Sequence, residues 1–154
     1  LVQAAVVSDP CKGEIFEAER GAGARLNGRA LRVSQTLRLA DALLVTGFPY
    51  GALRGASDLV DLFGSFLQQA RAVRRLGSAA LDLCYVATGR FEGFWEQHLK
   101  PWDVCAGVLI VEEAGGRFTS IAGEPGPWHG SALATNGRLH DAVLAALAGD
   151  GAKA

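Results

Sequence analysis

Segments with the pattern of buried strands alternate with helix-like segments along the second half of the chain. The apolar run 42–46 predicts a buried strand, and apolar residues at near-helical spacing predict a helix over 57–70. Further strands are predicted at 72–74, 91–96, 117–121 and 132–135, and further helices at 78–87, 104–114 and 139–147. This alternation predicts an α/β architecture in which helices flank a buried sheet.

The first 34 residues carry strand patterns without a helix of their own. Runs 2–7 and 14–18 predict a hairpin-like strand pair, the glycines that follow predict turns around 25–28, and 31–33 predicts a short edge strand. Because a two-stranded unit is marginal alone, we expect this pair to belong to a sheet whose other strands precede Leu1. The predicted organisation is therefore the end of an N-terminal α+β sheet domain (1–34), a C-terminal α/β domain (35–148) and a flexible tail (149–154).

Composition excludes several classes of protein. With 154 residues, 49% of them hydrophobic, the chain has the make-up of a folded domain and not of a disordered one. Fifteen basic against 16 acidic residues give a net charge of −1, which argues against a nucleic-acid or membrane surface. No apolar stretch reaches the roughly 18 residues that a membrane span needs.

Cysteine usage and the first residues bear on compartment and completeness. The three cysteines, Cys11, Cys84 and Cys105, are widely spaced, and no two of them form a C-x-x-C motif. This cysteine usage suits a reducing cytoplasm. Cys84 and Cys105 lie in apolar helical runs, where we expect buried thiols. The chain begins at Leu1, contains no Met and has no signal-peptide pattern, so we expect it to be a piece of a longer cytoplasmic protein.

Two carboxylates are the main candidates for chemistry. Asp103 lies in the first turn of the very apolar helix that starts at Pro101, where it either caps free N–H groups or binds a hard cation such as Mg²⁺ through oxygen. Glu96, seven residues earlier, ends an aromatic strand. It either marks the protein surface or accepts hydrogen bonds from the hydroxyls of a polyol.

Other conspicuous residues have structural or functional interpretations. The turn Gly77, Ser78 and Ala79 offers small side chains and free backbone N–H groups at a helix start, as a cap or as a site for a sugar oxygen or anion. The three histidines share no metal-ligand spacing, so we expect them on the surface or in loops. We expect Trp102 and Trp128 to be packing residues, and the pair at 74–75 to be solvated or to meet a phosphate or a partner subunit.

Several motifs together resemble the inositol monophosphatase family. Segment 77–89 reads GSAALDLCYVATG, and 94–107 reads FWEQHLKPWDVCAG, continuing to EEAGG at 112–116. EAERG at 17–21, LNG at 26–28 and TGFPY at 46–50 fit bacterial members. The similarity runs from about residue 2 to 147, and the Trp-Asp pair with its flanks is highly specific.

The resemblance implies a Mg²⁺-dependent phosphomonoesterase with a layered αβαβα architecture, homodimeric, acting on a small phosphorylated polyol. It implies that Asp103 is a metal ligand, that Glu96 contacts inositol hydroxyls, and that Gly77, Ser78 and Ala79 line the same pocket. The chain would then be the C-terminal part of the sandwich, with its opening strand pair belonging to the sheet of the other half.

The chain also departs from the family pattern. The other metal ligands in the family come from a Gly-Glu-Glu segment and an Asp-Pro-x-Asp-Gly-Thr motif, and this sequence has neither. Asp9-Pro10 imitates the second motif, but Lys12 stands where the acidic residue is needed, and Glu112-Glu113 imitates the first. We interpret both as decoys and predict that these 154 residues alone are inactive.

Alternative functions stay open. Within the same class the substrate would be fructose 1,6-bisphosphate, histidinol phosphate or a nucleotide phosphate. A different class is a binding partner of the transcription machinery, without catalysis and, given the near-neutral charge, without direct nucleic-acid contact. A third is a catalytically inactive homologue.

Overall fold

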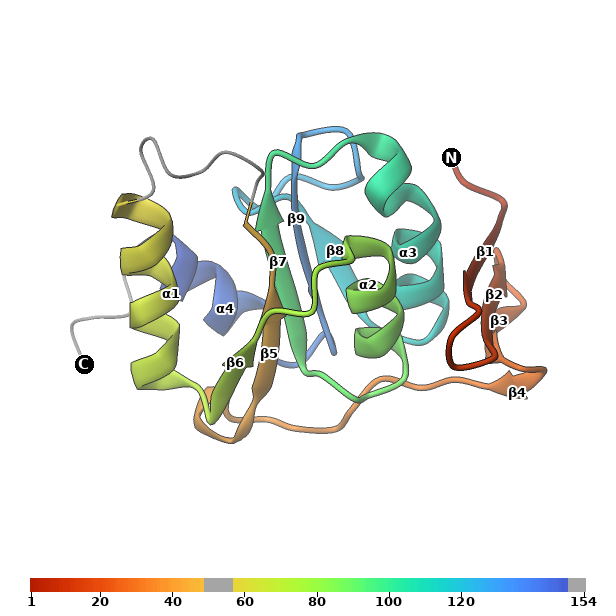
Figure 1. Cartoon of the computed structure of the whole chain (residues 1–154), viewed down its shortest axis with the longest axis horizontal. Helices are drawn as coiled ribbons and strands as arrows, with labels where there is room; N and C mark the ends of the chain where they lie inside the picture. Colours follow the sequence, from red (N-terminus) through yellow and green to blue (C-terminus); the bar gives the residue numbers. More distant parts are fainter. Residues whose placement is uncertain (49–56, 150–154) are drawn as a thin grey trace.

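The chain forms four stacked layers in a computed structural model that describes residues 1–48 and 57–149. In Figure 1 the layers run from the helix pair α1 (Ser57–Gln69) and α4 (His140–Leu147), through a five-stranded sheet, to the helix pair α2 (Ala79–Ala87) and α3 (Pro101–Glu113), and finally to a four-stranded sheet. The predicted α/β layering is confirmed. The loop motif beyond Phe48 and the predicted tail beyond Gly149 lie outside the described residues.

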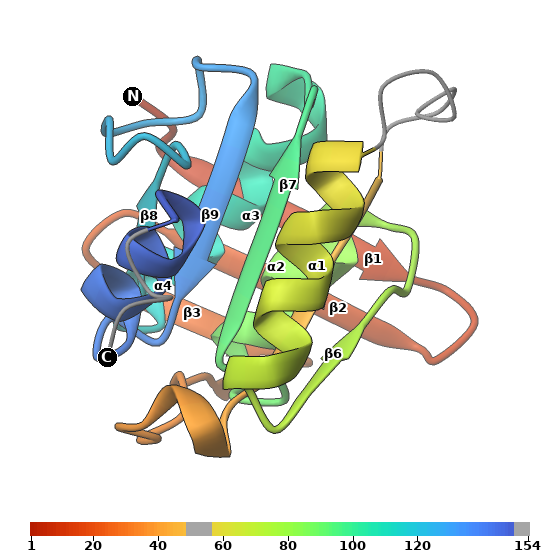
Figure 2. The ribbon, with the colours of Figure 1, turned by 90° about the vertical axis from the view of Figure 1, so that its left-hand side faces the viewer.

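The five-stranded sheet positions the second half of the chain. Its strand order is β6 (Ala72–Arg74), β5 (Leu43–Thr46), β7 (Gly93–Gln97), β9 (Ser131–Thr135) and β8 (Arg117–Thr119). β5 runs parallel to both β6 and β7, whereas β9 runs antiparallel to β7 and β8. Figure 2 shows α1 and α4 lying across one face, while α2 and α3 lie behind the other. Both faces are therefore covered, as the apolar strand sequences require.

The predicted strand pair is part of a four-stranded sheet. It is an antiparallel meander of β1 (Ala4–Asp9), β2 (Glu14–Glu19), β3 (Gly23–Leu26) and β4 (Arg29–Ala30). The stretch predicted as turns contains β3, because the true turn is confined to Asn27 and Gly28, which both have positive φ (47° and 76°). That pair of dihedrals fits a two-residue hairpin. The edge strand accordingly falls at Arg29–Ala30, before the predicted 31–33.

The middle helices serve both sheets, which explains their apolar sequences. α3 contacts β1, β2 and β3 on one side and β8 and β9 on the other, while α2 contacts β5, β7 and β9. One core cluster accordingly runs from Ala5 and Phe16 in the first sheet, through the middle helices, to Phe94 and Ala134 in the second. The predicted domain boundary at 34/35 falls in the extended segment 31–38 between the sheets and stays a prediction.

Gly107 on α3 lets the two middle helices approach closely, and this predicts opposite effects for two identical substitutions. A Cβ at Gly107 would lie 2.6 Å from the Cβ of Leu83, whereas a Cβ at Gly64 in α1 would meet nothing within 4 Å. We expect Gly107→Ala to lower the free energy of unfolding by about 2 kcal/mol through overpacking. Gly64→Ala should raise it by about 0.5–1 kcal/mol, because alanine favours the helix. Denaturant titration of both variants measures the signs, and equal signs would refute this account of the α2–α3 contact.

Several side chains lie where the sequence did not place them. His140 is fully buried, and Trp102 and Trp128 are 80% and 63% exposed, so neither the surface histidine nor the packing tryptophans were predicted correctly. Cys84 is buried as predicted, but Cys105 is only partly buried.

The strand predicted at 117–121 ends at Thr119, because Ser120 starts a turn in which its Oγ accepts the N–H groups of Ala122 and Glu124. Within the described ranges, no helix is long and apolar enough to cross a bilayer.

Candidate functional site

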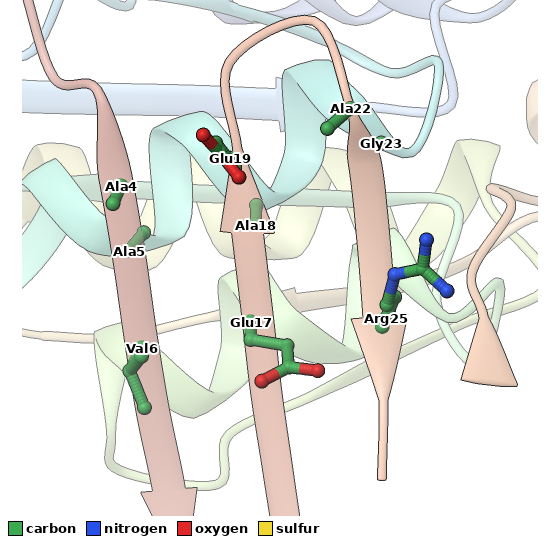
Figure 3. Close-up of a pocket in the computed structure, with 9 residues that line it drawn as sticks. All are labelled: Ala4, Ala5, Val6, Glu17, Ala18, Glu19, Ala22, Gly23 and Arg25. Atoms are coloured by element: carbon green, nitrogen blue, oxygen red, sulfur yellow. The ribbon is translucent and has the colours of Figure 1, made fainter. Parts of the chain in front are cut away.

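Two hollows deserve comparison as candidate sites. The first, of about 370 Å³, lies on the four-stranded sheet and is lined by small residues with Glu17 and Arg25 on adjacent strands. Figure 3 shows Glu17 on β2 between Val6 on β1 and Arg25 on β3. None of the predicted site residues lies there.

The second hollow, of about 520 Å³, collects every predicted site residue. Its lining comes from the segment after β5, the start of α2, the end of β7 and the start of α3. The lining residues are Phe48, Gly77, Ser78, Ala79, Ala80, Glu96, Gln97, His98, Leu99, Trp102 and Asp103. Gly77, Ser78, Ala79, Glu96 and Asp103 thus lie around one hollow, and their assignment to a substrate and metal site stays a prediction.

Glu96 is held at the pocket by the packing of β7 against β5. Thr46 pairs with Trp95 in the parallel register, so Gly47 follows directly beside Glu96. A Cβ at Gly47 would collide with the Glu96 carboxyl group, which shows how closely that carboxyl lies against the backbone. Burial raises the pKa of Glu96 to about 7, and the negative charge of Asp103 adds to this while Arg75 opposes it. The Glu96 side chain is thus partly buried, and the pKa of its carboxyl is raised.

Asp103 lies in the first turn of α3 and takes part in capping it. Its Oδ2 accepts the backbone N–H of Lys100 at 2.8 Å, in a capping-box arrangement, with Pro101 at the start of the helix. The capping interpretation is therefore confirmed. It does not exclude a second role, because a carboxylate has about four acceptor positions and this bond uses one.

The start of α2 forms the third wall of the pocket. Gly77 has φ of 95°, and Ser78 caps the helix by accepting the N–H of Leu81 at 3.5 Å. A positive φ of this size suits glycine and turns the chain sharply into the helix. The first-turn N–H groups of a helix have no partner within the helix, so this wall can offer donors to an oxygen in the pocket.

The acidic decoys have structural roles. Asp9 closes its own turn by accepting the N–H groups of Cys11 and Lys12 at 3.1 and 3.3 Å, and it also binds the side chains of Lys12 and Tyr85. Lys12 in turn donates to the Tyr85 hydroxyl.

The Glu112-Glu113 pair ties the middle layer to the first sheet. Glu112 pairs with Arg20 at 3.2 Å, and Glu113 accepts the N–H groups of Gly21 and Gly23 at 2.8 and 2.9 Å. These bonds fasten the end of α3 to the β2–β3 turn. Both acidic motifs thus stabilise the fold, and neither lines the pocket.

A third carboxyl, which the sequence motifs did not single out, lies near the pocket. Asp82, in the first turn of α2, is completely buried, and neither of its oxygens has a hydrogen-bond partner among the described residues. Burial, followed by the charge of Glu96, raises its pKa to about 7. The signal was an acidic residue inside the otherwise apolar stretch 79–87.

The described residues of the pocket do not by themselves form a complete metal centre. Among the residues that the structure describes, no group of three or more His, Cys, Asp or Glu side chains could hold a metal ion. Asp103 and Glu96 supply carboxylate oxygens of the kind that Mg²⁺ prefers, but a divalent ion needs about six oxygen ligands. Described residues of this chain therefore fit one side of a metal site only.

Comparison with known proteins places this layered fold and pocket in a family. The sequence model of the inositol monophosphatase family matches residues 1–151, so the chain belongs to this family. The resemblance inferred from the motifs is confirmed.

Relatives share much of this chain but are considerably longer. It is 44% identical to "Nus factor SuhB" of Escherichia coli over 93% of the chain and 54% of that protein. It is 47% identical to "Phosphatase IMPL1, chloroplastic" of Arabidopsis thaliana over 86% of the chain and 36% of that protein. The chain thus spans about a third to a half of these relatives.

Solved structures support the same fold. Inositol monophosphatase from Anabaena superposes with a TM-score of 0.88 at 43% identity, over 96% of this chain and 59% of that one. A Staphylococcal IMPase-II bound to inositol monophosphate superposes with a TM-score of 0.80 at 28% identity, over 92% of this chain and 55% of that one.

Proposed function

We propose that the protein containing these residues is a Mg²⁺-dependent phosphomonoesterase that hydrolyses inositol monophosphate. The observation that carries the proposal is the single pocket that gathers Glu96, Asp103 and the first turn of α2. Support comes from membership in the inositol monophosphatase family and from the related IMPase-II that binds inositol monophosphate. We further propose a cytoplasmic homodimer.

Each part of the pocket has a role in this proposal. Asp103 contributes one carboxylate to Mg²⁺ while its capping bond fixes the side chain. Glu96 accepts hydrogen bonds from ring hydroxyls, and the Gly77–Ala79 turn offers backbone donors to a substrate oxygen. When bound, Mg²⁺ would supply a Lewis acid that activates water and stabilises the leaving oxygen.

The 154 residues alone would be inactive in this proposal. Their pocket provides a substrate wall and one metal carboxylate, and the relatives are longer than this chain. The remaining ligands and the phosphate cradle would come from residues outside this chain. We therefore expect phosphatase activity from the full-length protein only.

Phosphate release from inositol 1-phosphate tests the proposal. We expect Mg²⁺-dependent release by the full-length protein and none by residues 1–154 at the same concentration. Fructose 1,6-bisphosphate, histidinol phosphate and a nucleotide monophosphate run in parallel, since IMPase-II has also been solved with 2′AMP. Equal or faster turnover of one of these esters would replace the inositol assignment, and no turnover of any ester would refute the enzyme.

Gly47 allows a direct test of the role given to Glu96. Because a Cβ at this position collides with the Glu96 carboxyl, Gly47→Ala should displace that carboxyl and raise KM for inositol 1-phosphate by roughly tenfold. Glu96→Gln provides the matched comparison, since it alters the same group without moving the backbone. An unchanged KM in both variants would show that Glu96 does not contact the substrate.

A second candidate function is association with the transcription machinery. Its support is the 44% identity to proteins named Nus factor SuhB. Binding of the full-length protein to RNA polymerase, retained in Asp103→Asn and insensitive to Mg²⁺, would favour this function. Loss of phosphate release in the same variant would show that both functions coexist on separate surfaces.

A further inference from the structure

We propose that Asp82 is a positioning residue: its buried carboxyl keeps its proton and, through one internal water, donates the hydrogen bond that holds Glu96 in place for a polyol substrate. This inference rests on the proposed function, because it assigns Glu96 to substrate binding. It adds a residue that does not line the pocket and that touches neither substrate nor metal.

The first observation is the isolation of Asp82. Its side chain is completely buried in the middle layer, yet neither carboxyl oxygen has a hydrogen-bond partner among the described residues. An ionised carboxylate without partners is very costly to bury, so a group in this setting neutralises. Among the described residues, the two carboxyl oxygens of Asp82 are the only buried side-chain nitrogen or oxygen atoms without a hydrogen-bond partner.

The second observation is the neighbour of Asp82. α2 packs against β7, the strand that carries Glu96, and Glu96 is the one charged side chain whose field acts noticeably on Asp82. Two neighbouring carboxyls in a water-poor region do not both ionise readily, and Glu96 is the more exposed of the two. Of the two carboxyls, Glu96 therefore gives up its proton first, and Asp82 keeps its own when Glu96 becomes the anion.

The burial of Asp82 and its position near Glu96 indicate how the two carboxyls are linked. A protonated carboxyl has one O–H to donate, and the ionised acceptor beside it is Glu96. Neither carboxyl oxygen of Asp82 has a hydrogen-bond partner among the described residues, so in this proposal one ordered water makes the link. Gly47 limits Glu96 on its other side, so the carboxylate is confined between the β5 backbone and this hydrogen bond.

Two substitutions of similar size separate the neutral donor from other roles. Asp82→Asn keeps a donor without charge, so KM of the full-length enzyme for inositol 1-phosphate should stay within about twofold. Asp82→Leu removes the donor and should raise KM roughly tenfold with little change in kcat. Equal damage by both variants would mean that Asp82 acts as an anion, and an unchanged KM in Asp82→Leu would mean that it does not position Glu96. Either result overturns the proposal.

A second measurement is independent of activity. The ¹³C chemical shift of the Asp82 carboxyl, assigned by comparison with Asp82→Asn, should report a protonated acid at pH 6 in the full-length protein. An ionised carboxyl at that pH would refute the inference even if Asp82→Leu fails to fold. If Asp82 is protonated but Glu96→Gln leaves KM unchanged, the proposed substrate contact fails while the proton assignment stands.

Discussion

Replacing Asp103 by Asn should reduce Mg²⁺-dependent phosphate release by the full-length protein roughly a thousandfold. The loss follows from removing one anionic oxygen ligand, since a bound metal contributes several kcal/mol of transition-state stabilisation. Asparagine keeps a side-chain oxygen that can still accept the Lys100 N–H, so the cap of α3 survives. Steady-state phosphate release over a Mg²⁺ titration measures the effect.

The matched control is Asp141→Asn. Asp141 is also an acidic residue in the first turn of a helix, α4, where it pairs with Arg117 at 2.8 Å on the surface. Both substitutions remove a charge from a helix start, but only Asp103 lines the pocket. We therefore expect normal activity in Asp141→Asn. Wild-type activity in Asp103→Asn would remove Asp103 from the metal site.

His140 should lower stability as the pH falls from about 6.5 to 4, whereas Asp82 and Glu96, whose pKa values are raised to about 7, should raise stability over the same range. Burial, with a smaller contribution from Arg117, lowers the pKa of His140 from 6.5 to about 4. Its ring nitrogens lie 3.0 and 3.1 Å from the hydroxyls of Thr119 and Thr135. Below pH 6.5 His140 binds a proton in the unfolded chain but not in the folded chain, so its contribution to stability is full above that pH. About 3 kcal/mol of this His140 contribution is lost on reaching pH 4.

The pH dependence of unfolding isolates this contribution. Between pH 6.5 and pH 4, the free energy of unfolding of His140→Gln should change more favourably than that of the unchanged protein, by about 3 kcal/mol, whatever the variant does to stability at pH 7. His129→Gln, at an exposed histidine, should leave this pH dependence as it is. The same pH dependence in all three proteins would show that His140 titrates normally in the folded state.

The elements of the fold were largely readable from the sequence because apolar runs and glycines mark them locally. The predicted helices and the strand at 42–46 are present, and the four-stranded sheet was missed only in part. There the glycines at 21, 23 and 28 predicted a series of turns: Gly21 does lie in the β2–β3 turn and Gly28 in the β3–β4 hairpin turn, but Gly23 begins β3. Spacing alone does not show which glycine a turn uses.

The candidate site was accessible because its residues belong to contiguous, specific motifs, such as the Trp-Asp pair. Asp82, Gly47 and the burial of His140 were not accessible, because each depends on which distant segments meet. Asp82 owes its raised pKa to burial by the middle layer and to Glu96 on another element. His140 owes its burial and contacts to β8 and β9. Such properties arise only when the chain is folded.

Sharing of the middle helices by two sheets has a consequence for biosynthesis. The strands β1 to β4 leave the ribosome before α2 and α3, which cover their apolar face and follow only after Ser78. At translation rates of about 5–20 residues per second, that face waits on the order of several seconds for its cover. We therefore expect the nascent chain to engage a holding chaperone during this interval, and to release it once α3 has emerged.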